Sequence, residues 1–278
     1  MCKNASRTGI VIVSSYIVRA LQSQLPDAQF LYYSRQLLLP DWSEQHQLQL
    51  QQKKLLIVGM GGLGCAAAPY LVASGVGSIT LADDDSIDSS NLQRQILYRE
   101  YDVGLNKVEQ AAASLRQLNS EISVSALSRR LSDSDLAALV PEFSLVLDCT
   151  DNLTSRNAIS AACVQARVPL VSGAAIRFEG QVASFSMQGD DACYHCLSQL
   201  FGEQQLSCME AGILSPLVGI VGSMQALEAV KILAGVGTPL YGKLQLFDAL
   251  TCQWRQLSLN KDPLCSVCAT PAPATKTA

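Results

Sequence analysis

The sequence predicts an α/β protein built on a Rossmann-like mixed sheet, with a parallel N-terminal half, antiparallel C-terminal strands and helices on both faces. Apolar segments with strand-like and helix-like patterns alternate from residue 55 to residue 172, which is the order of a parallel sheet with crossover helices. A glycine-rich loop joins the first strand to the first helix. Beyond residue 173 the pattern changes to alternating strands around one long apolar helix, and this change predicts the antiparallel half.

The composition is that of a compact globular protein. Hydrophobic residues make up 49% of the 278 residues, charged residues make up 16%, and the mean hydropathy is +0.20, which excludes a largely disordered chain. The formal net charge of -4 provides no broad basic face for a nucleic-acid backbone, so we expect no nucleic-acid partner. A phosphate-bearing ligand would need a local cluster of basic residues instead.

The elements of the parallel half follow from apolar runs bounded by turn residues. The predicted strands are 55–58, 78–83, 122–127, 145–148 and 169–172, each near-continuously apolar, as strands buried on both faces are. The predicted helices between them are 63–74, 107–118, 133–140 and 154–167. This order predicts right-handed crossovers that place helices on the two faces of the sheet.

The second half follows a different pattern. Residues 181–187 alternate between apolar and polar like an antiparallel strand, and a crossover rich in glycine and cysteine follows them. A long helix over 216–233 then precedes strand-like segments at 243–247 and 253–259.

We therefore expect one domain over 29–268, with a nucleotide-binding half at about 50–172 and a second half at about 173–268. Residues 1–28 form an extension whose status the sequence leaves open. The tail 269–278, made mostly of Ala, Pro and Thr, is predicted to be disordered.

Two segments imitate membrane or export signals. The stretch 55–82 carries no charged residue, yet its glycines and Pro69 interrupt it, so we interpret it as two buried strands flanking a helix. At the N-terminus, Lys3 and Arg7 precede a short apolar run that Arg19 ends, without a clear cleavage site. We expect neither a membrane span nor a membrane partner.

The ten cysteines include two close pairs, Cys193 with Cys196 and Cys265 with Cys268. Two C-x-x-C pairs are typical of a tetrahedral thiolate zinc site, and we expect one structural Zn²⁺ per chain. A single pair could instead be a redox motif, and His195 inside the first pair could be mistaken for a ligand, although four thiolates already complete the site. The many unpaired thiols favour a reducing, cytoplasmic location.

The first motif with chemistry is the loop Gly59-Met60-Gly61-Gly62-Leu63-Gly64 between the first strand and helix. Glycines let the backbone approach a phosphate, and the helix N-terminus presents free N–H groups. Asp83 ends the next strand, where a carboxylate can accept hydrogen bonds from ribose hydroxyls. A lone glycine loop is often only a tight turn, but the strand, helix and Asp83 together favour an adenosine-containing ligand.

A second set of polar residues follows the strands on the same edge of the sheet, where ligands bind in this architecture. These residues are Ser90, Asn91, Leu92, Gln93, Arg94, Lys107, Asp151 and Asn152. Arg94 and Lys107 could neutralise a triphosphate, and Asp151 could hold Mg²⁺. The competing interpretation is ordinary surface charge for Arg94 and Lys107, and a helix cap for Asp151 or Asn152.

Taken together, these motifs resemble the ubiquitin-activating-enzyme-like adenylyltransferases over roughly residues 29–268. The motifs that carry the resemblance are Tyr33-Ser34-Arg35-Gln36, Gly59 to Gly64, Ser90 to Arg94, Lys107, Asp148 to Asn152 and both cysteine pairs. The stretch Cys193 to Cys208, followed by Glu210-Ala211-Gly212, is most similar to the branch of the family that serves molybdopterin synthase.

The resemblance implies a reaction in which the C-terminal glycine carboxylate of a small ubiquitin-like sulfur carrier, ending in Gly-Gly, attacks the α-phosphate of ATP. By the same analogy Gly62 and Asp83 contact adenosine, while Ser90, Asn91, Arg94 and Lys107 hold phosphates. Asp151 binds Mg²⁺ and Asn152 lines the site. Arg35 adds a phosphate contact, reaching across a homodimer that binds two carriers as a heterotetramer. The half 173–268 would bind the carrier.

Cys208 occupies a position where some relatives in this family carry a reactive thiol. In the molybdopterin branch the resemblance implies an external sulfur donor, so we interpret Cys208 as an accessory thiol rather than an essential nucleophile.

Three alternatives remain open at this stage. A thiamine-pathway adenylyltransferase would present the same ATP site to a different carrier. An NAD-dependent oxidoreductase would share the glycine loop and Asp83 but would leave Arg94, Lys107 and Asp151 unexplained. A noncatalytic, zinc-stabilised scaffold for a ubiquitin-like protein would leave the phosphate residues without a purpose.

Overall fold

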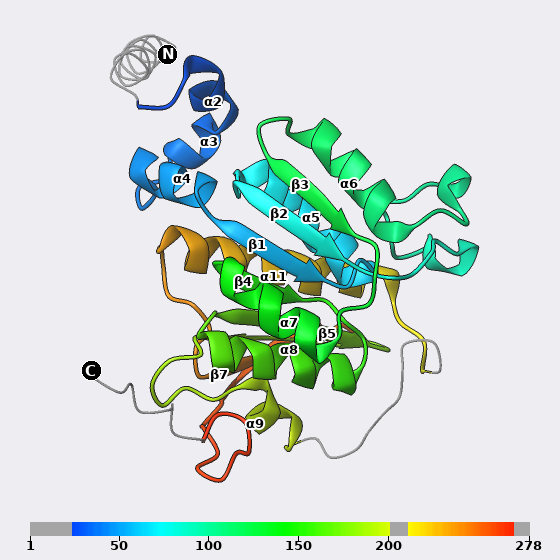
Figure 1. Ribbon diagram of the computed structural model, residues 1–278, viewed down its shortest axis with the longest axis vertical. Helices are drawn as coiled ribbons and strands as arrows, with labels where there is room; N and C mark the ends of the chain where they lie inside the picture. Colours follow the sequence, from blue (N-terminus) through cyan, green and yellow to red (C-terminus); the bar gives the residue numbers. More distant parts are fainter. Residues whose placement is uncertain (1–23, 201–210, 270–278) are drawn as a thin grey trace, which may run out of the picture.

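The computed structural model describes residues 24–200 and 211–269, which form an eight-stranded mixed sheet with helices on both faces (Figure 1). The strand order is β3-β2-β1-β4-β5-β6-β7-β8. Neighbours from β3 to β5 pair in parallel, and β5-β6, β6-β7 and β7-β8 pair antiparallel. The Rossmann-like mixed sheet predicted from the sequence is confirmed.

The strands lie close to their predicted positions. They are β1 (Lys54–Val58), β2 (Ser78–Ala82), β3 (Ser123–Leu127), β4 (Leu145–Asp148), β5 (Leu170–Ile176), β6 (Glu179–Phe185), β7 (Lys243–Asp248) and β8 (Gln253–Ser258). The clearest difference is β5, which runs four residues beyond its predicted end at residue 172. Its extra length pairs with β6 across a hairpin in which Arg177 adopts a left-handed φ of 53°. The pattern of apolar residues along one segment does not predict antiparallel pairing with the next strand, and the predicted strand therefore ended too early.

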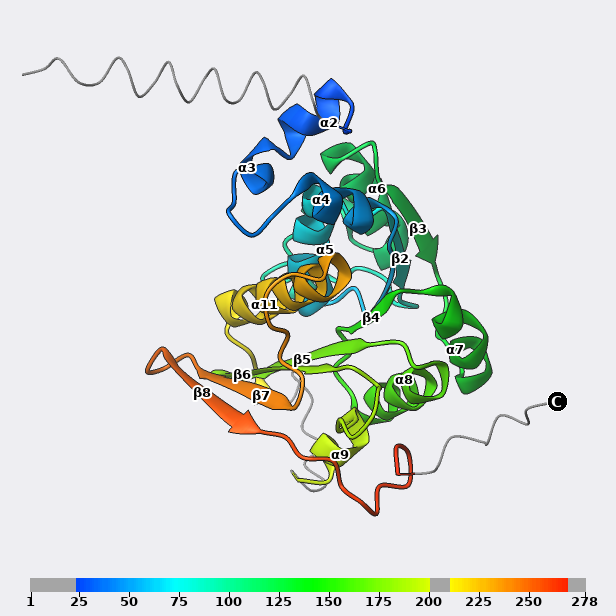
Figure 2. The same cartoon turned by 90° about the vertical axis from the view of Figure 1, so that its left-hand side faces the viewer.

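Helices cover the two faces of the sheet as two layers (Figure 2). One layer contains α4 (Glu44–Gln51), α5 (Gly62–Ser74), α6 (Lys107–Leu118) and α11 (Ser215–Ala234). The other contains α7 (Asp133–Leu139), α8 (Leu153–Ala166) and the short α9 (Tyr194–Ser198). Short 3₁₀ turns lie at η1 (Ser89–Asn91), η2 (Glu100–Asp102) and η3 (Val140–Glu142).

Each face of the sheet has its own apolar core. In β1, Leu55 and Ile57 pack into the core under α5 and α11, whereas Leu56 packs into the core under α8 and α9. Side chains alternate across a strand, so a run of apolar residues supplies both cores at once. This explains why the central strands are almost continuously apolar, with polar residues such as Asp148 near their carboxyl ends.

Within the described residues from 24 onward, three helices precede the sheet: α2 (Asp27–Tyr32), α3 (Ser34–Leu37) and α4. No helix or strand is predicted from the sequence in this segment. The α4 segment is rich in glutamine and polar overall, and it begins with a capping box in which Ser43 and His46 exchange hydrogen bonds. The expected extension at 1–28 and tail at 269–278 fall almost entirely outside the described residues.

Helix α11 is, among the described residues, the one helix long and apolar enough by length and composition to cross a membrane. Its apolar surface is used inside the fold, where it packs against α5, β5 and β6. The charge-free stretch 55–82 forms β1, α5 and β2, which agrees with its interpretation as strand, helix and strand.

Candidate nucleotide site and metal centre

The glycine loop follows β1 and packs tightly against the loop after β4. Gly59 adopts a φ of +93°, and a Cβ at this position would lie 2.8 Å from the carbonyl oxygen of Cys149. A Cβ on Gly64 would lie 2.2 Å from the carbonyl oxygen of Gly59. Both glycines are therefore required by close backbone packing.

The other two glycines of the predicted motif have different surroundings. A Cβ on Gly61 would meet only the side-chain amide nitrogen of Gln95, at 3.8 Å, and one on Gly62 would touch Val218 of α11 at 3.1 Å. Gly61 is the N-cap of α5 and provides no capping side chain. No side chain therefore caps the first N–H groups of α5, and an uncapped helix N-terminus is a typical binding site for an anion.

Asp83 lies immediately after β2 and holds the glycine loop. Its Oδ2 accepts a hydrogen bond from the backbone N–H of Met60 at 2.6 Å, and its Oδ1 accepts one from the N–H of Asp85 at 2.9 Å. Burial raises the pKa of this carboxyl above its usual range, although these hydrogen bonds oppose the shift. The Tyr98 hydroxyl also donates to the Met60 carbonyl, at 2.8 Å. Asp83 is thus beside the loop, as the sequence predicted, and also part of its support.

Lys107 begins α6 and points its ammonium group at Asp85. The two side chains form an ion pair of 2.8 Å, in which Lys107 is 6% exposed and Asp85 is 66% exposed. Lys107 has three N–H donors, so this pair leaves others for a ligand oxygen. The carboxylates of residues 83–85 lie close to one another, and that of Asp85 is the one paired with Lys107.

The segment from Ser90 to Arg94 leaves the sheet as η1 and a turn. Asp88 caps this turn and accepts hydrogen bonds from the N–H and the hydroxyl of Ser90, at 2.8 and 2.6 Å. Arg94 is tied to the Ser90 carbonyl at 3.1 Å. The remaining members of the predicted set sit within this turn: Asn91 is half-buried, Leu92 packs against the core, and the Gln93 carbonyl accepts a hydrogen bond from Ser215 of α11.

Asp151 and Asn152 follow β4, and both are exposed. Asn152 is the N-cap of α8, accepting from the N–H of Ser155 at 2.8 Å. The buried carboxylate of Asp148 supports this loop, because its Oδ1 accepts from the N–H and the hydroxyl of Thr150 at 3.0 and 2.7 Å. The capping interpretation of Asn152 is thus present in the structure, and it leaves the Asp151 carboxylate facing solvent beside the loop.

Arg35 lies in α3, away from the other predicted site residues of its own chain. The neighbouring Tyr33 packs against Gly75 at the C-terminal end of α5, whereas the glycine loop is at the N-terminal end. Thirteen residues of helix separate these ends, a distance of roughly 20 Å. Arg35 is therefore not brought to the glycine loop of its own chain.

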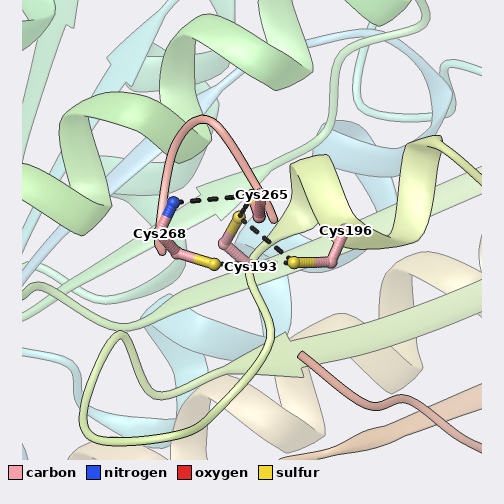
Figure 3. A group of neighbouring side chains, drawn as sticks. All are labelled: Cys193, Cys196, Cys265 and Cys268. Carbon is pink, nitrogen blue, oxygen red and sulfur yellow. Dashed lines mark hydrogen bonds between the residues drawn. The ribbon is translucent and has the colours of Figure 1, made fainter. Parts of the chain in front are cut away.

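The four paired cysteines converge from segments far apart in the sequence (Figure 3). Their sulfur atoms lie 4.0 Å apart for Cys193 and Cys196, 3.8 Å for Cys193 and Cys265, and 3.5 Å for Cys196 and Cys268. A tetrahedron of thiolates around zinc needs sulfur separations of about 3.8 Å, from Zn–S bonds of about 2.3 Å. The four residues therefore fit a zinc ion closely.

Two further observations concern this metal centre. His195 lies outside the cluster and contacts the Ser266 hydroxyl at 3.3 Å, consistent with its interpretation as a bystander. Burial raises the pKa of Cys265, but hydrogen bonds from the N–H groups of Cys268 and Val267 lower it to about 7 overall. Burial raises the pKa of the neighbouring Cys193 and Cys268 thiols, so the lowered pKa is particular to Cys265 within this cluster.

Several residues at the site had not been singled out from the sequence. Gln95 is 3% exposed beside Gly61, and its Oε1 is the one buried side-chain polar atom of the described residues without a hydrogen-bond partner. Gln225 of α11 donates to the Asp148 carbonyl at 2.7 Å, and Arg156 of α8 donates to the Thr150 carbonyl. No local pattern marks Gln225 or Arg156, whereas Gln95 directly follows the predicted set. Cys208 lies outside the described residues.

The mixed sheet with a glycine loop at its carboxyl edge defines a Rossmann-type fold, and relatives of this chain are named adenylyltransferases. A model of the ThiF family matches residues 33–267, and the chain belongs to that family. The resemblance predicted from the motifs is confirmed.

Named relatives and solved structures agree with this membership. The chain is 50% identical over 246 residues to the molybdopterin-synthase adenylyltransferase of Escherichia coli (strain K12), covering 88% of this chain and 99% of that protein. It is 43% identical over 242 residues to the sulfur carrier protein ThiS adenylyltransferase of the same organism, covering 87% and 96%. The crystal structure of E. coli MccB with ATP matches with a TM-score of 0.76 at 26% identity, over 86% of this chain and 75% of that one.

Proposed function

We propose that this protein adenylates the C-terminal glycine carboxylate of the small ubiquitin-like sulfur-carrier subunit of molybdopterin synthase, in molybdenum cofactor biosynthesis. The observation that carries the proposal is the 50% identity to a molybdopterin-synthase adenylyltransferase over 99% of that protein. The fold supports it, because the glycine loop follows β1, the carboxylate of Asp151 follows β4 and the buried Lys107 is paired with Asp85 after β2, all beyond the carboxyl ends of parallel strands.

The reaction requires little proton chemistry. A carrier carboxylate oxygen forms a bond to the α-phosphorus of ATP, and the bond to the bridging oxygen breaks, so that pyrophosphate leaves with its electron pair. The carboxylate is already ionised at neutral pH, and the barrier therefore lies in bringing negative groups together. The reaction therefore needs positive groups that neutralise the phosphates and needs no general base.

Different residues of the predicted site would bind the phosphates, the ribose and the magnesium ion. Lys107, Arg94 and the N-terminal N–H groups of α5 neutralise phosphate oxygens, with Ser90 and Asn91 adding hydrogen bonds. Asp83 retains lone pairs for ribose hydroxyls while it holds Met60. Asp151, with Asn152 beside it, would hold Mg²⁺, which neutralises phosphate charge when bound. Gln95, with its unpaired Oε1, would complete the polar lining around Gly61.

Lys107 already has one partner before a phosphate binds. In the structure its ammonium binds Asp85, and an incoming phosphate would share or displace that carboxylate. Because the charge of Lys107 is nearly buried, Asp85 keeps it paired until a ligand arrives.

The position of Arg35 supports a homodimer. Its distance from the glycine loop of its own chain means that a phosphate contact by Arg35 would be made in the site of a second copy. Two carriers would then bind one dimer. Mixing Arg35→Ala with Asp151→Ala protein tests this: one complete site forms in each mixed dimer, restoring about a quarter of wild-type exchange. No recovery on mixing would contradict the shared site.

Compartment and sulfur chemistry form the rest of the proposal. All cysteines of the described residues are free thiols, which supports a reducing cytoplasm. Sulfur for the adenylated carrier would come from an external donor, with Cys208 as an accessory thiol. The zinc of the four-cysteine centre would be structural.

ATP-pyrophosphate exchange with Mg²⁺ tests the central claim. The assay is run separately with the molybdopterin-synthase carrier and the thiamine-pathway carrier, because the second relative is 43% identical. We expect exchange with the first carrier, lost in Asp151→Ala and retained in Asp190→Ala, an exposed aspartate away from the loop. Exchange with only the thiamine-pathway carrier would reassign the substrate, and exchange with neither would refute adenylation.

A further inference from the structure

Arg156 lies between the Asp151 loop and the cysteine centre. Its Nε and Nη2 donate to the carbonyl oxygen of Thr150 at 3.2 and 2.6 Å, and its Nη1 donates to the hydroxyl of Tyr194 at 3.5 Å. Thr150 directly precedes Asp151, and Tyr194 directly follows the metal-centre residue Cys193. One guanidinium group thus contacts both regions.

The other end of the Thr150 residue is also held. Asp148 accepts from its N–H and hydroxyl, so that the backbone entering Asp151 is fixed by Asp148 on one side and by Arg156 on the other. The planar fork of an arginine makes two donations to one carbonyl directional, which a lysine cannot reproduce. Arg156 thus orients the Thr150 carbonyl, and with it the peptide bond that leads into Asp151.

Tyr194 lies between two cysteines of the centre and is also held by α8 and by a neighbouring ring. The N–H of Tyr194 donates to the Ser160 hydroxyl of α8 at 3.2 Å, and its ring packs edge-on against Phe185 with ring centroids 6.2 Å apart. Tyr194 starts α9, and this helix carries Cys196, one of the four residues whose sulfurs fit zinc. Because Cys193 directly precedes Tyr194 and Cys196 lies two residues after it, binding of one metal ion by both cysteines would constrain the backbone at Tyr194.

We propose that Arg156 is a positioning residue through which the closed cysteine centre holds the Asp151 loop in the form that binds Mg-ATP. The metal centre then does more than stabilise the fold: its closure sets the magnesium-dependent part of ATP affinity. This inference rests on the proposed function, because it assigns Asp151 to magnesium.

The test is ATP binding by calorimetry in the presence and absence of Mg²⁺, with zinc content and thermal unfolding measured on each sample. The key variant is Tyr194→Phe, which removes one hydroxyl and keeps every cysteine. We expect unchanged zinc content and binding of Mg-ATP weakened about two- to tenfold, as for one lost hydrogen bond, with magnesium-free ATP binding unchanged. Tyr241→Phe, a half-buried tyrosine of the antiparallel half, is the matched control and should match wild type.

A second variant, Arg156→Lys, lies outside the cysteine pairs and keeps the positive charge. It should reproduce the magnesium-specific loss with full zinc content, and it decides the question if Tyr194→Phe releases zinc. Equal weakening of ATP binding with and without Mg²⁺, or wild-type binding in both variants, would overturn the inference. Wild-type protein that shows no magnesium-dependent ATP binding would instead refute the proposed function, and the inference with it.

Discussion

Asp83 and Met60 are joined by a hydrogen bond of 2.6 Å, from the Met60 N–H to the Asp83 carboxylate. This contact ties the end of β2 to the glycine loop after β1, two segments that the parallel sheet brings side by side. A carboxylate expected to hold ribose is therefore also part of the loop's framework.

Asp83→Asn tests this double role. An Asn side chain can satisfy only one of the two backbone donors, so Met60 or Asp85 loses its acceptor. We expect the free energy of unfolding in urea to fall by about 1–3 kcal/mol. Asp84→Asn, an exposed neighbour, should change it by less than about 0.5 kcal/mol. Equal effects of the two substitutions would contradict a framework role for Asp83.

The raised pKa of Asp83 adds a pH dependence with a definite sign. The unfolded carboxyl titrates near its ordinary value of about 3.9, and burial moves the folded value above that. Between these two pKa values the folded state holds the extra proton, so the contribution of Asp83 to stability decreases as the pH rises through that window. As the pH rises from about 4 to about 7, the free energy of unfolding of the wild type minus that of Asp83→Asn should decrease. If this difference increased with pH, burial would not be what determines the pKa of Asp83.

Lys107 and its partner Asp85 should differ sharply in their effects on activity. Lys107→Met removes a buried cation from the phosphate region, and we expect exchange to fall roughly 10- to 100-fold, the equivalent of one charge-assisted hydrogen bond. Asp85→Asn leaves the lysine charge in place and should keep exchange within about threefold. A larger loss from Asp85→Asn than from Lys107→Met, measured in the same exchange assay, would place the essential charge on Asp85.

Two glycines of one loop should respond differently to the same substitution. Gly64→Ala forces a Cβ against the Gly59 carbonyl and should cost about 1–3 kcal/mol of stability. A Cβ at Gly61 meets no atom closer than 3.8 Å, so the thermal unfolding of Gly61→Ala should stay near wild type while its ATP binding weakens. Scanning calorimetry and ATP titration of both variants separate these outcomes. A stable Gly64→Ala variant would show that the loop can move.

If the four-cysteine centre holds zinc, replacing one of its cysteines should remove the metal, and replacing a cysteine elsewhere should not. Cys265→Ser should reduce zinc content from one per chain to near zero and lower the unfolding temperature, because a structural site loses one of four ligands. Cys163→Ser is the matched control, since this thiol of α8 is fully buried in the same core but lies outside the cluster. Its zinc content should stay at one per chain by atomic emission. Zinc retained in Cys265→Ser would mean that the metal is held elsewhere.

Sequence reasoning anticipated the sheet elements well because their signals are local. The strand β4 and the helix α6 lie at their predicted bounds, since each is an apolar run or an amphipathic segment ended by polar residues. The helices α2 to α4 were not predicted from the sequence, because they lack a strong apolar period. Packing against the end of α5, where Tyr33 meets Gly75, stabilises them instead.

The sequence by itself determined the class of fold, the family and the residue types of the site, since short motifs such as Gly59 to Gly64 and the cysteine pairs depend on spacing along the chain. Only the tertiary structure decided which groups meet: Lys107 with Asp85, Gln225 with the Asp148 carbonyl, Arg156 between Thr150 and Tyr194. Such contacts join residues far apart in sequence, and their geometry is set by how the helices pack on the sheet. No periodicity within one segment encodes that packing.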